Sequence, residues 1–258
     1  MVRALIVGLL VSLCAALLGV SLVLKRYSMI GDGLSHVGFG ALAVASVLGA
    51  SELGVAIPVV VVAAVLLLRL SSSAAIKGDA AIALISTGSL ALGVLVISVT
   101  SGMNTDVMNF LFGSILAIDS TDLWLLAGLT LFVAILFTFL LRPIQTIAFD
   151  STFAKSQHLP VTAIEYMMMT LIAMTIVATI KMVGIVLAIS LLTIPQMTAN
   201  LFTYSYKRMI GASIVIGCID CIVGLYASYL LNVPSGATTI FVSIILFAAA
   251  RILAARKH

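Results

Sequence analysis

Residues 4–24 read ALIVGLLVSLCAALLGVSLVL, a run without a single charged side chain. A helix needs about 20 mainly apolar residues to cross the hydrocarbon core of a bilayer, and this run has that length. Similar apolar blocks recur along the chain, so we predict further membrane-spanning helices. The nine predicted spans are residues 4–24, 34–50, 53–70, 80–100, 122–141, 162–180, 183–203, 209–230 and 236–254.

The overall composition supports the same assignment. The chain of 258 residues is 63% hydrophobic and 9% charged, with a mean hydropathy of +1.32. An average soluble domain has roughly 45–50% apolar and about 25% charged residues, so a soluble globular class is excluded. The apolar blocks are continuous rather than alternating, which excludes a β-barrel. We therefore predict an all-α, polytopic integral membrane protein of eight to nine transmembrane helices, with residues 1–258 in a single transmembrane domain.

Basic residues predict the orientation of the chain in the membrane. With the N-terminus outside and nine spans, eleven of the 13 lysines and arginines face the cytoplasm, and Arg3 and Lys181 face outward. Cytoplasmic loops of membrane proteins carry an excess of Lys and Arg, so this arrangement is favoured. It places the C-terminus in the cytoplasm, together with residues 142–160, the longest stretch of mixed polarity on that side.

The segment MIGDGLSHVGFG, residues 29–40, carries the first candidate site. Asp32 and His36 are four positions apart and would share one face of a helix. A carboxylate and an imidazole suit a first-row divalent cation such as zinc or manganese. A buried Asp–His pair that simply orients helices is the alternative reading. Two ligands do not complete a metal site, so water, other polar groups or a second copy of the chain would supply the rest.

Asp220 is a second candidate, because it lies in the middle of the 209–230 block. An ionisable residue at that depth is a functional candidate by default. Its neighbours Cys218 and Cys221 could form a thiolate site with it, although cysteine also commonly behaves as a small buried hydrophobe. A pathway role for Asp220 and a plain structural role both remain open.

Pro195, Gln196 and Asn200 interrupt the seventh predicted span. Proline removes a hydrogen bond from the helical ladder, which a membrane helix tolerates where protein or water satisfies the freed groups. The three residues therefore predict either a kink beside a translocation path or a packing kink with interhelical hydrogen bonds.

Five segments together resemble the permease subunits of zinc- and manganese-type ABC importers. The first contains a close relative of that family's signature, roughly R-x-S-L-I-G-D-A-L-S-H-A, and the others follow in family order across nearly the whole chain. The segments are LKRYSMIGDGLSHVGFGALAVA (24–45), NFLFGSIL (109–116), FDSTFAKSQHLP (149–160), VGIVLAISLLTIPQMTA (183–199) and VPSGATTI (233–240).

The resemblance implies a fold similar to that of the cobalamin and siderophore importers, with one span fewer at the N-terminus. It implies a homodimer of permease chains in a bacterial-type plasma membrane, two cytoplasmic ATP-binding subunits and an extracytoplasmic metal-binding protein. It also implies that Asp32 and His36 are metal ligands in the translocation pathway. The transported ion, Zn²⁺ or Mn²⁺, would then be cargo, and no permanently bound cofactor is expected.

The resemblance further implies that the segment 142–160 couples the permease to its ATPase. The residues expected to form this docking element are Asp150, Ala154 and Lys155. The sequence departs from the family here, because Ser151 and Thr152 replace the usual Pro-Glu and His158 stands where a glycine is common.

We therefore expect a permease subunit that is not itself an enzyme. No Walker-type phosphate-binding motif occurs in the chain, so a partner would hydrolyse the ATP. The alternative keeps the fold and changes the cargo to a chelated metal, as in siderophores, or to cobalamin, neither of which needs the Asp–His pair. An intramembrane protease is disfavoured because its Gly-x-Ser-x-Gly and His-Glu-x-x-His motifs are absent.

Overall fold

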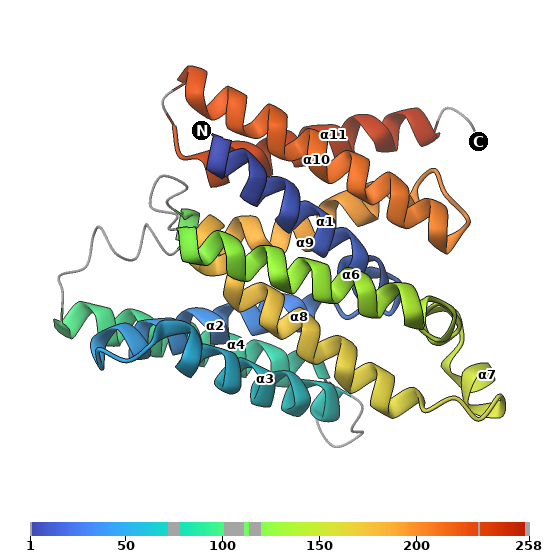
Figure 1. Ribbon diagram of the computed structural model, residues 1–258, viewed down its shortest axis with the longest axis horizontal. Helices are drawn as coiled ribbons and strands as arrows, with labels where there is room; N and C mark the ends of the chain where they lie inside the picture. Colours follow the sequence, from blue (N-terminus) through green and yellow to red (C-terminus); the bar gives the residue numbers. More distant parts are fainter. Residues whose placement is uncertain (1, 72–77, 101–110, 114–119, 232, 256–258) are drawn as a thin grey trace.

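The computed structural model describes residues 2–71, 78–100, 111–113, 120–231 and 233–255, and the long elements within these ranges are helices (Figure 1). Three of the basic residues counted for the orientation lie outside these ranges, namely Lys77, Arg256 and Lys257. The helices are α1 (Val2–Leu24), α2 (Ser28–Val47), α3 (Glu52–Ser71), α4 (Gly78–Thr100), α6 (Ser120–Phe149), α7 (Ser151–Ser156), α8 (Val161–Val183), α9 (Ile185–Asn200), α10 (Tyr206–Leu231) and α11 (Ser235–Ala255).

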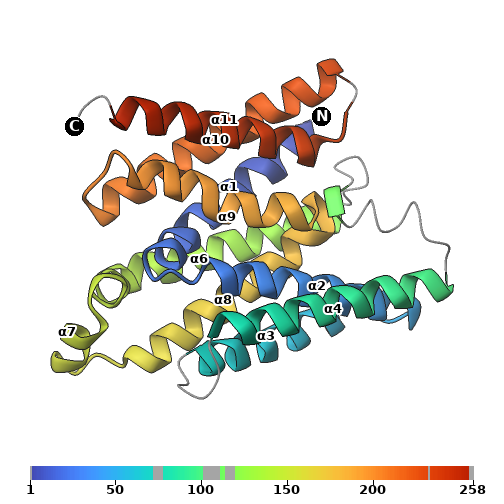
Figure 2. The ribbon, with the colours of Figure 1, turned by 180° about the vertical axis from the view of Figure 1, so that it is seen from behind.

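Eight of the described helices are long and apolar enough to cross a membrane, so the predicted all-α polytopic fold is confirmed. The span predicted at residues 183–203 corresponds to α9, which has 16 residues. At 1.5 Å per residue α9 measures about 24 Å, less than the ~30 Å of a hydrocarbon core. It nevertheless runs back along the bundle beside α8 (Figures 1 and 2). Gly184, with a φ of 89°, forms the turn between them.

Successive long helices alternate in direction, so the start of α1 and the end of α11 lie at opposite ends of the bundle (Figure 1). We call the end that carries α7 and the turn of residues 25–27 the α7 end, and the opposite end the Gly184 end. The described basic residues, apart from Arg3 and Lys181, lie in or beside helix termini at the α7 end. They are Lys25, Arg26, Arg69, Arg142, Lys155, Lys207, Arg208 and Arg251.

Two boundaries differ from those predicted by hydropathy. α2 begins at Ser28, six residues before the predicted span at 34, so Asp32 lies inside the helix and not at its mouth. The glycines and the carboxylate of this segment lower its hydropathy without preventing a helix that other helices enclose. α6 continues from the predicted end at residue 141 to Phe149, through Arg142 and Pro143, and carries the chain beyond the apolar span to α7.

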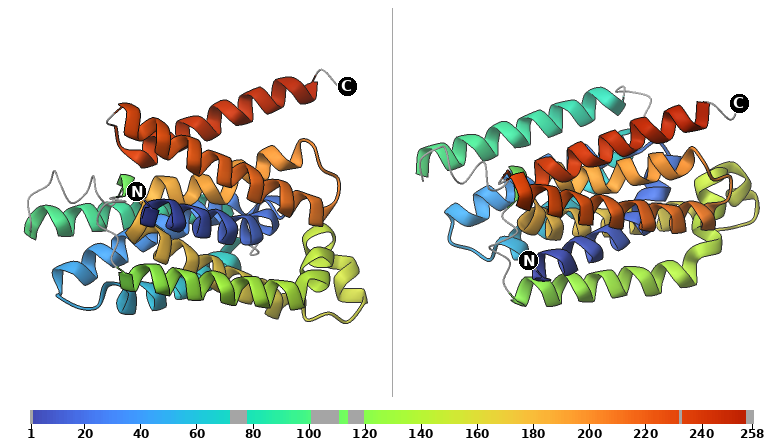
Figure 3. Two further views of the ribbon diagram at one scale, coloured as in Figure 1. Left: turned by 45° about the horizontal axis from the view of Figure 1, so that its top comes forward. Right: turned by 90° about the horizontal axis from the view of Figure 1, so that it is seen from above.

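α2 is an inner helix of the bundle. In its central stretch 72% of the residues are buried, against 17% for α11. Seen from above, α6 and α4 lie on opposite sides of the bundle (Figure 3). The glycines of α2 permit the close packing that their small size predicts. A Cβ at Gly40 would lie 2.7 Å from the Ser89 carbonyl oxygen of α4, and one at Gly38 would lie 2.9 Å from the Ile180 side chain of α8.

At the Gly184 end, three of the five family-like segments meet through glycines. A Cβ at Gly113 would overlap the backbone at Val183 and Gly184, and one at Gly236 would lie 2.6 Å from the Phe112 carbonyl oxygen. Gly113 and Gly184 also have positive φ angles, of 72° and 89°. Their lack of a side chain therefore serves both the backbone conformation and the close approach. The remainder of the predicted 101–121 loop lies largely outside the described residues.

The outward-facing Lys181 predicted from the sequence has two carboxylate neighbours at this end. Its Nζ lies 3.1 Å from Asp122 Oδ1 at the start of α6 and 3.7 Å from Glu52 Oε2 at the start of α3. The Glu52 side chain is one-third exposed and takes part in this ion cluster. This cluster ties α3, α6 and α8 together.

Candidate functional site

Asp32 and His36 lie on one face of α2, as their spacing predicts. His36 Nε2 is 3.8 Å from Asp32 Oδ1, which is too long for a hydrogen bond. The Asp32 side chain is 44% exposed and the His36 side chain 22% exposed, so both reach a surface of this chain. His36 Nδ1 is buried and has no hydrogen-bond partner among the described residues. Among the described residues, the pair therefore offers a carboxylate oxygen and an imidazole nitrogen that are free to bind a metal ion.

The described residues of one chain do not bring together a complete set of metal ligands. Among the described residues, no group of three or more His, Cys, Asp and Glu side chains is placed to hold a metal ion. A carboxylate oxygen and an imidazole nitrogen are ligands suited to first-row divalent cations. A cavity of about 260 Å³ between α2, α3 and α4 begins one residue beyond His36, at Val37, and continues past Gly40 and Val44. Its lining is apolar except for Ser89, so the cavity adds little coordination.

Asp220 lies in a different part of the bundle, where α10 packs on α1, α9 and α11. It is fully buried, and neither carboxylate oxygen has a hydrogen-bond partner among the described residues. The described structure does not group Asp220 with Asp32 and His36.

Cys218 and Cys221 are free thiols, and Cys221 Sγ accepts a hydrogen bond of 3.4 Å from Ser12 Oγ of α1. Gly8 of the same helix packs directly on the Cys221 side chain. The contacts of Cys221 are thus those of a small buried side chain at a helix interface.

In α9, a side-chain hydrogen bond replaces the backbone hydrogen bond that Pro195 cannot donate. Pro195 has no N–H for the carbonyl of Leu191, four residues earlier, and Gln196 Nε2 donates to that oxygen at 3.0 Å. The same Nε2 donates to the Ala15 carbonyl of α1 at 2.9 Å. Gln196 is fully buried, whereas Asn200 is exposed at the end of the helix. The contact with Ala15 is an interhelical hydrogen bond of the kind that the packing interpretation of Pro195 predicts, whereas the contact with Leu191 lies within α9.

The segment 142–160 contains the short helix α7. Asp150 is its N-cap, because Asp150 Oδ1 accepts hydrogen bonds from the backbone N–H groups of Thr152 at 2.8 Å and Phe153 at 3.0 Å. Ala154 is buried and Lys155 is exposed in the last turn. The sequence argument missed Phe153, an apolar side chain that is 51% exposed on this helix.

His158 lies just after α7 and has a φ of 58°. This left-handed conformation is favourable for glycine, which explains why a glycine suits the position.

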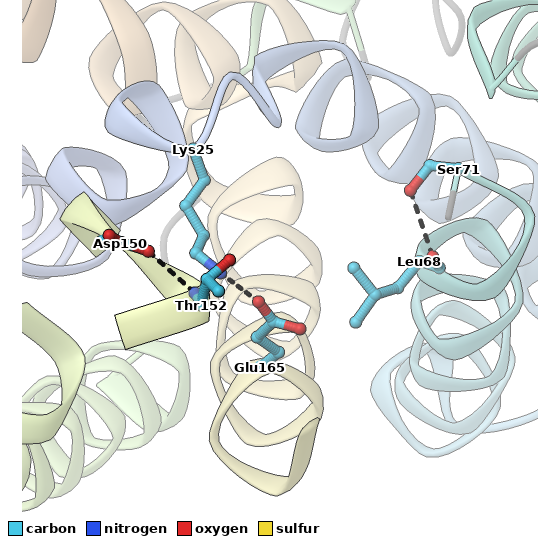
Figure 4. A network of polar contacts seen from close by, with 6 residues as sticks. All are labelled: Lys25, Leu68, Ser71, Asp150, Thr152 and Glu165. Carbon is cyan, nitrogen blue, oxygen red and sulfur yellow. Dashed lines mark hydrogen bonds and ion pairs between the residues drawn. The ribbon is translucent and has the colours of Figure 1, made fainter. Parts of the chain in front are cut away.

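Sequence reasoning also missed two contacts that hold the start of α8. Glu165 forms an ion pair with Lys25 in the turn between α1 and α2 (Figure 4). The next residue, Tyr166, accepts a hydrogen bond of 3.1 Å from Arg69 Nε in the last turn of α3. Burial and the nearby Glu165 carboxylate raise the pKa of Tyr27, in the same turn as Lys25. The available signal was Glu165 itself, an acid near the start of the apolar block at 162–180.

Comparisons with known proteins agree with this architecture. A manganese transport system membrane protein, MntC, from Halalkalibacterium halodurans is 33% identical over 96% of this chain and 85% of its own length. The solved structure of PsaBC from Streptococcus pneumoniae in complex with Fab matches with a TM-score of 0.87 and 30% identity, covering 96% of this chain and 89% of that chain.

A third comparison carries information on the fold alone. A solved ABC transporter described as metal-chelate type, in an inward-facing conformation, matches with a TM-score of 0.79 at 15% identity, over 97% of this chain and 85% of that chain. The family model of the ABC 3 transport family matches residues 1–254. The chain described here, with its helical bundle, its Asp32–His36 pair and its α7 segment, belongs to the ABC 3 transport family.

Proposed function

We propose that this chain is the membrane-spanning permease of an ABC importer and that Mn²⁺ is its cargo. The observation that carries the proposal is the Asp32–His36 pair, which leaves a carboxylate and an imidazole available on an inner helix. Manganese as cargo is supported by relatives described as manganese transport or import proteins, at 33% and 31% identity. Zn²⁺ accepts the same donor types and is the competing ion to test.

The metal site is completed in this proposal by a second copy of the chain. Two copies related by a two-fold axis would present two carboxylates and two imidazoles, and would bring four ligands to one ion. The support is the incomplete donor set in a single chain together with the partial exposure of both side chains. Closed two-fold symmetry is the commonest arrangement of homo-oligomers.

The α7 end faces the cytoplasm in this proposal, with the N-terminus outside. The support is the gathering of the described basic residues at that end, as the positive-inside rule requires. α7 then docks on a cytoplasmic ATP-binding subunit through the exposed Phe153 and Lys155, with Asp150 and the buried Ala154 holding the helix in place. An extracytoplasmic metal-binding protein would deliver the ion to the Gly184 end.

The test is transport by purified permease reconstituted in vesicles with its ATP-binding subunit and binding protein. We expect ATP-dependent uptake of Mn²⁺ that Asp32→Ala and His36→Ala each reduce at least tenfold, about 1.4 kcal/mol or more in transition-state free energy. The matched control is Asp79→Ala, which removes an exposed carboxylate outside both the donor pair and the 142–160 segment.

The same assay separates the alternatives. Normal transport by well-assembled Asp32→Ala and His36→Ala variants would contradict the metal pathway and favour a chelated cargo such as a siderophore or cobalamin. Preference for Zn²⁺ over Mn²⁺ would contradict the choice of metal alone. Uptake that needs no ATP would contradict the importer class.

A further inference from the structure

The ion pair between Lys25 and Glu165 joins two parts of the chain that are 140 positions apart. The Lys25 side chain is 14% exposed and the Glu165 side chain 21% exposed, so water reaches both charges poorly. Pairs that are partly buried are screened less by solvent and salt than exposed pairs. In Figure 4 the Lys25 side chain extends from the α1–α2 turn to Glu165 on α8. The ion pair therefore links the α1–α2 turn directly to α8 at the α7 end.

On the Lys25 side, the ion pair is close in sequence to the candidate metal site. The backbone N–H groups of Ile30 and Gly31 donate to the Tyr27 carbonyl, so the turn that carries Lys25 continues without a break into α2. Asp32 follows at the next position, and His36 one turn later. A displacement of the Lys25 turn therefore moves the base of the helix that holds both donors.

On the Glu165 side, the ion pair is close in sequence to α7. Gln157–Pro160 are all that separate the end of α7 from α8, and Glu165 lies in the second turn of α8. Tyr166, next to Glu165, holds Arg69 at the end of α3, the helix that follows α2. Two successive residues of α8 thus contact Lys25, before α2, and Arg69, at the end of α3.

The helices beneath the ion pair are not fully packed. A cavity of about 30 Å³ lies between α1, α6 and α8, and its lining includes Lys25, Glu165, Met168, Met169 and Ile172. Protein interiors are normally close-packed, and methionine is a side chain that adapts readily to changing gaps. The Lys25–Glu165 pair therefore borders a small gap between α1 and the α6–α8 pair, with space for about one water molecule.

From these contacts we propose that Lys25 and Glu165 are a positioning pair that transmits displacement of α7 to the Asp32–His36 helix. The inference rests on the proposed function, in which the ATP-binding subunit displaces α7 during its ATP cycle and α2 holds the metal. When α7 and the start of α8 move, Glu165 carries Lys25 and the α1–α2 turn with it. Without the pair, α8 moves over the cavity while α2 stays behind, and ATP is hydrolysed without import.

The test measures Mn²⁺ imported per ATP hydrolysed by the reconstituted complex. We expect Lys25→Glu and Glu165→Lys each to lower this ratio about tenfold, and the double exchange Lys25→Glu/Glu165→Lys to restore it to within about threefold of wild type. Arg26→Glu is the matched control, because it makes the same charge change at the neighbouring exposed residue and should leave the ratio unchanged. Should a reversal fail to assemble, Lys25→Gln and Glu165→Gln remove the charges with less disturbance.

A purely structural role predicts another result. Fewer assembled complexes would lower import and ATP hydrolysis together, so their ratio would stay constant, and this outcome would overturn the proposal. Single variants that disturb the ratio without recovery in the double exchange would overturn it too. Absence of ATP-driven Mn²⁺ uptake by the wild type would instead overturn the proposed function, and the role of the pair with it.

Discussion

At the scale of single residues, Gln196 replaces the hydrogen bond that Pro195 removes. Its side chain donates to the Leu191 carbonyl of its own helix and to the Ala15 carbonyl of α1. In a bilayer no water competes for these oxygens, so an internal donor is needed at this depth. Proline and glutamine therefore act as one unit in α9.

We expect Gln196→Leu to destabilise the protein by about 1 kcal/mol, since it leaves the buried Leu191 carbonyl unsatisfied and removes the interhelical hydrogen bond to Ala15. Adding Pro195→Ala should recover part of the loss, because an alanine in place of the proline supplies the backbone N–H that the Leu191 carbonyl lacks. The measurement is thermal unfolding of both variants in detergent. Equal stability of Gln196→Leu and wild type would contradict a stabilising role for the Gln196 hydrogen bonds. Loss of transport in a stable Pro195→Ala protein would show that Pro195 serves translocation.

His158 illustrates a residue whose backbone conformation matters more than its side chain. A left-handed conformation costs a residue with a Cβ roughly 1–2 kcal/mol, a cost that glycine avoids. Glycine loses more chain entropy on folding, which offsets part of this advantage. We therefore expect His158→Gly to stabilise the turn after α7 by about 0.5–1 kcal/mol. Hydrogen exchange of the backbone amides of residues 157–159 checks this, and faster exchange in the variant would contradict it.

At the scale of elements, α7 is too short to be stable by itself. Helices shorter than about 12–15 residues are marginal in water, and α7 has six residues. Its N-cap at Asp150 and the burial of Ala154 therefore decide whether it is presented to a partner as a helix. Ser151 and Thr152, which replace the family's usual residues, leave the N-cap intact because it uses backbone N–H groups and the Asp150 carboxylate.

We expect Asp150→Ala to weaken α7 by about 1 kcal/mol and to lower affinity for the ATP-binding subunit several-fold, because the cap is lost. Asp150→Asn keeps an oxygen acceptor at the cap and should retain most of the affinity. Titration of the ATP-binding subunit onto permease in nanodiscs measures both variants. If the two variants reduce affinity equally, the charge of Asp150 contacts the partner and capping is not its main role.

At the scale of the whole molecule, the proposed metal site depends on two chains. The described part of one chain groups fewer than three metal-ligating side chains at any one place. We expect purified permease to bind one Mn²⁺ per two chains, since a transition metal commonly takes at least four ligands. Binding should weaken as the pH falls, because the metal requires the neutral imidazole of His36.

Mixed dimers test this arrangement further. A dimer with one wild-type chain and one Asp32→Ala/His36→Ala chain retains half of the donors, and its Mn²⁺ affinity should fall well below that of the wild type. The measurement is equilibrium binding of Mn²⁺ to purified mixed dimers. One Mn²⁺ per single chain, or unchanged affinity in the mixed dimer, would contradict a shared site.

Much of the architecture was predictable because it depends on local sequence. Apolar blocks of membrane-spanning length predicted the helices, and the spacing of Asp32 and His36 predicted their shared face. The start of α2 was misplaced because hydropathy penalises Asp32 and the glycines around it. Glu165 and Lys25 were missed as a pair because nothing in either local sequence indicates a partner 140 positions away.

The sequence by itself determined that this protein is a polytopic helical membrane protein with a donor pair on its second helix, because span length and helical periodicity are local properties. Tertiary structure alone decided that Glu165 holds Lys25, that Gln196 reaches Ala15 and that Gly113, Gly184 and Gly236 converge. The physical reason is that lipid and protein interior are equally apolar. Hydropathy therefore places helices in the membrane, whereas close packing of small residues and a few polar contacts choose their neighbours.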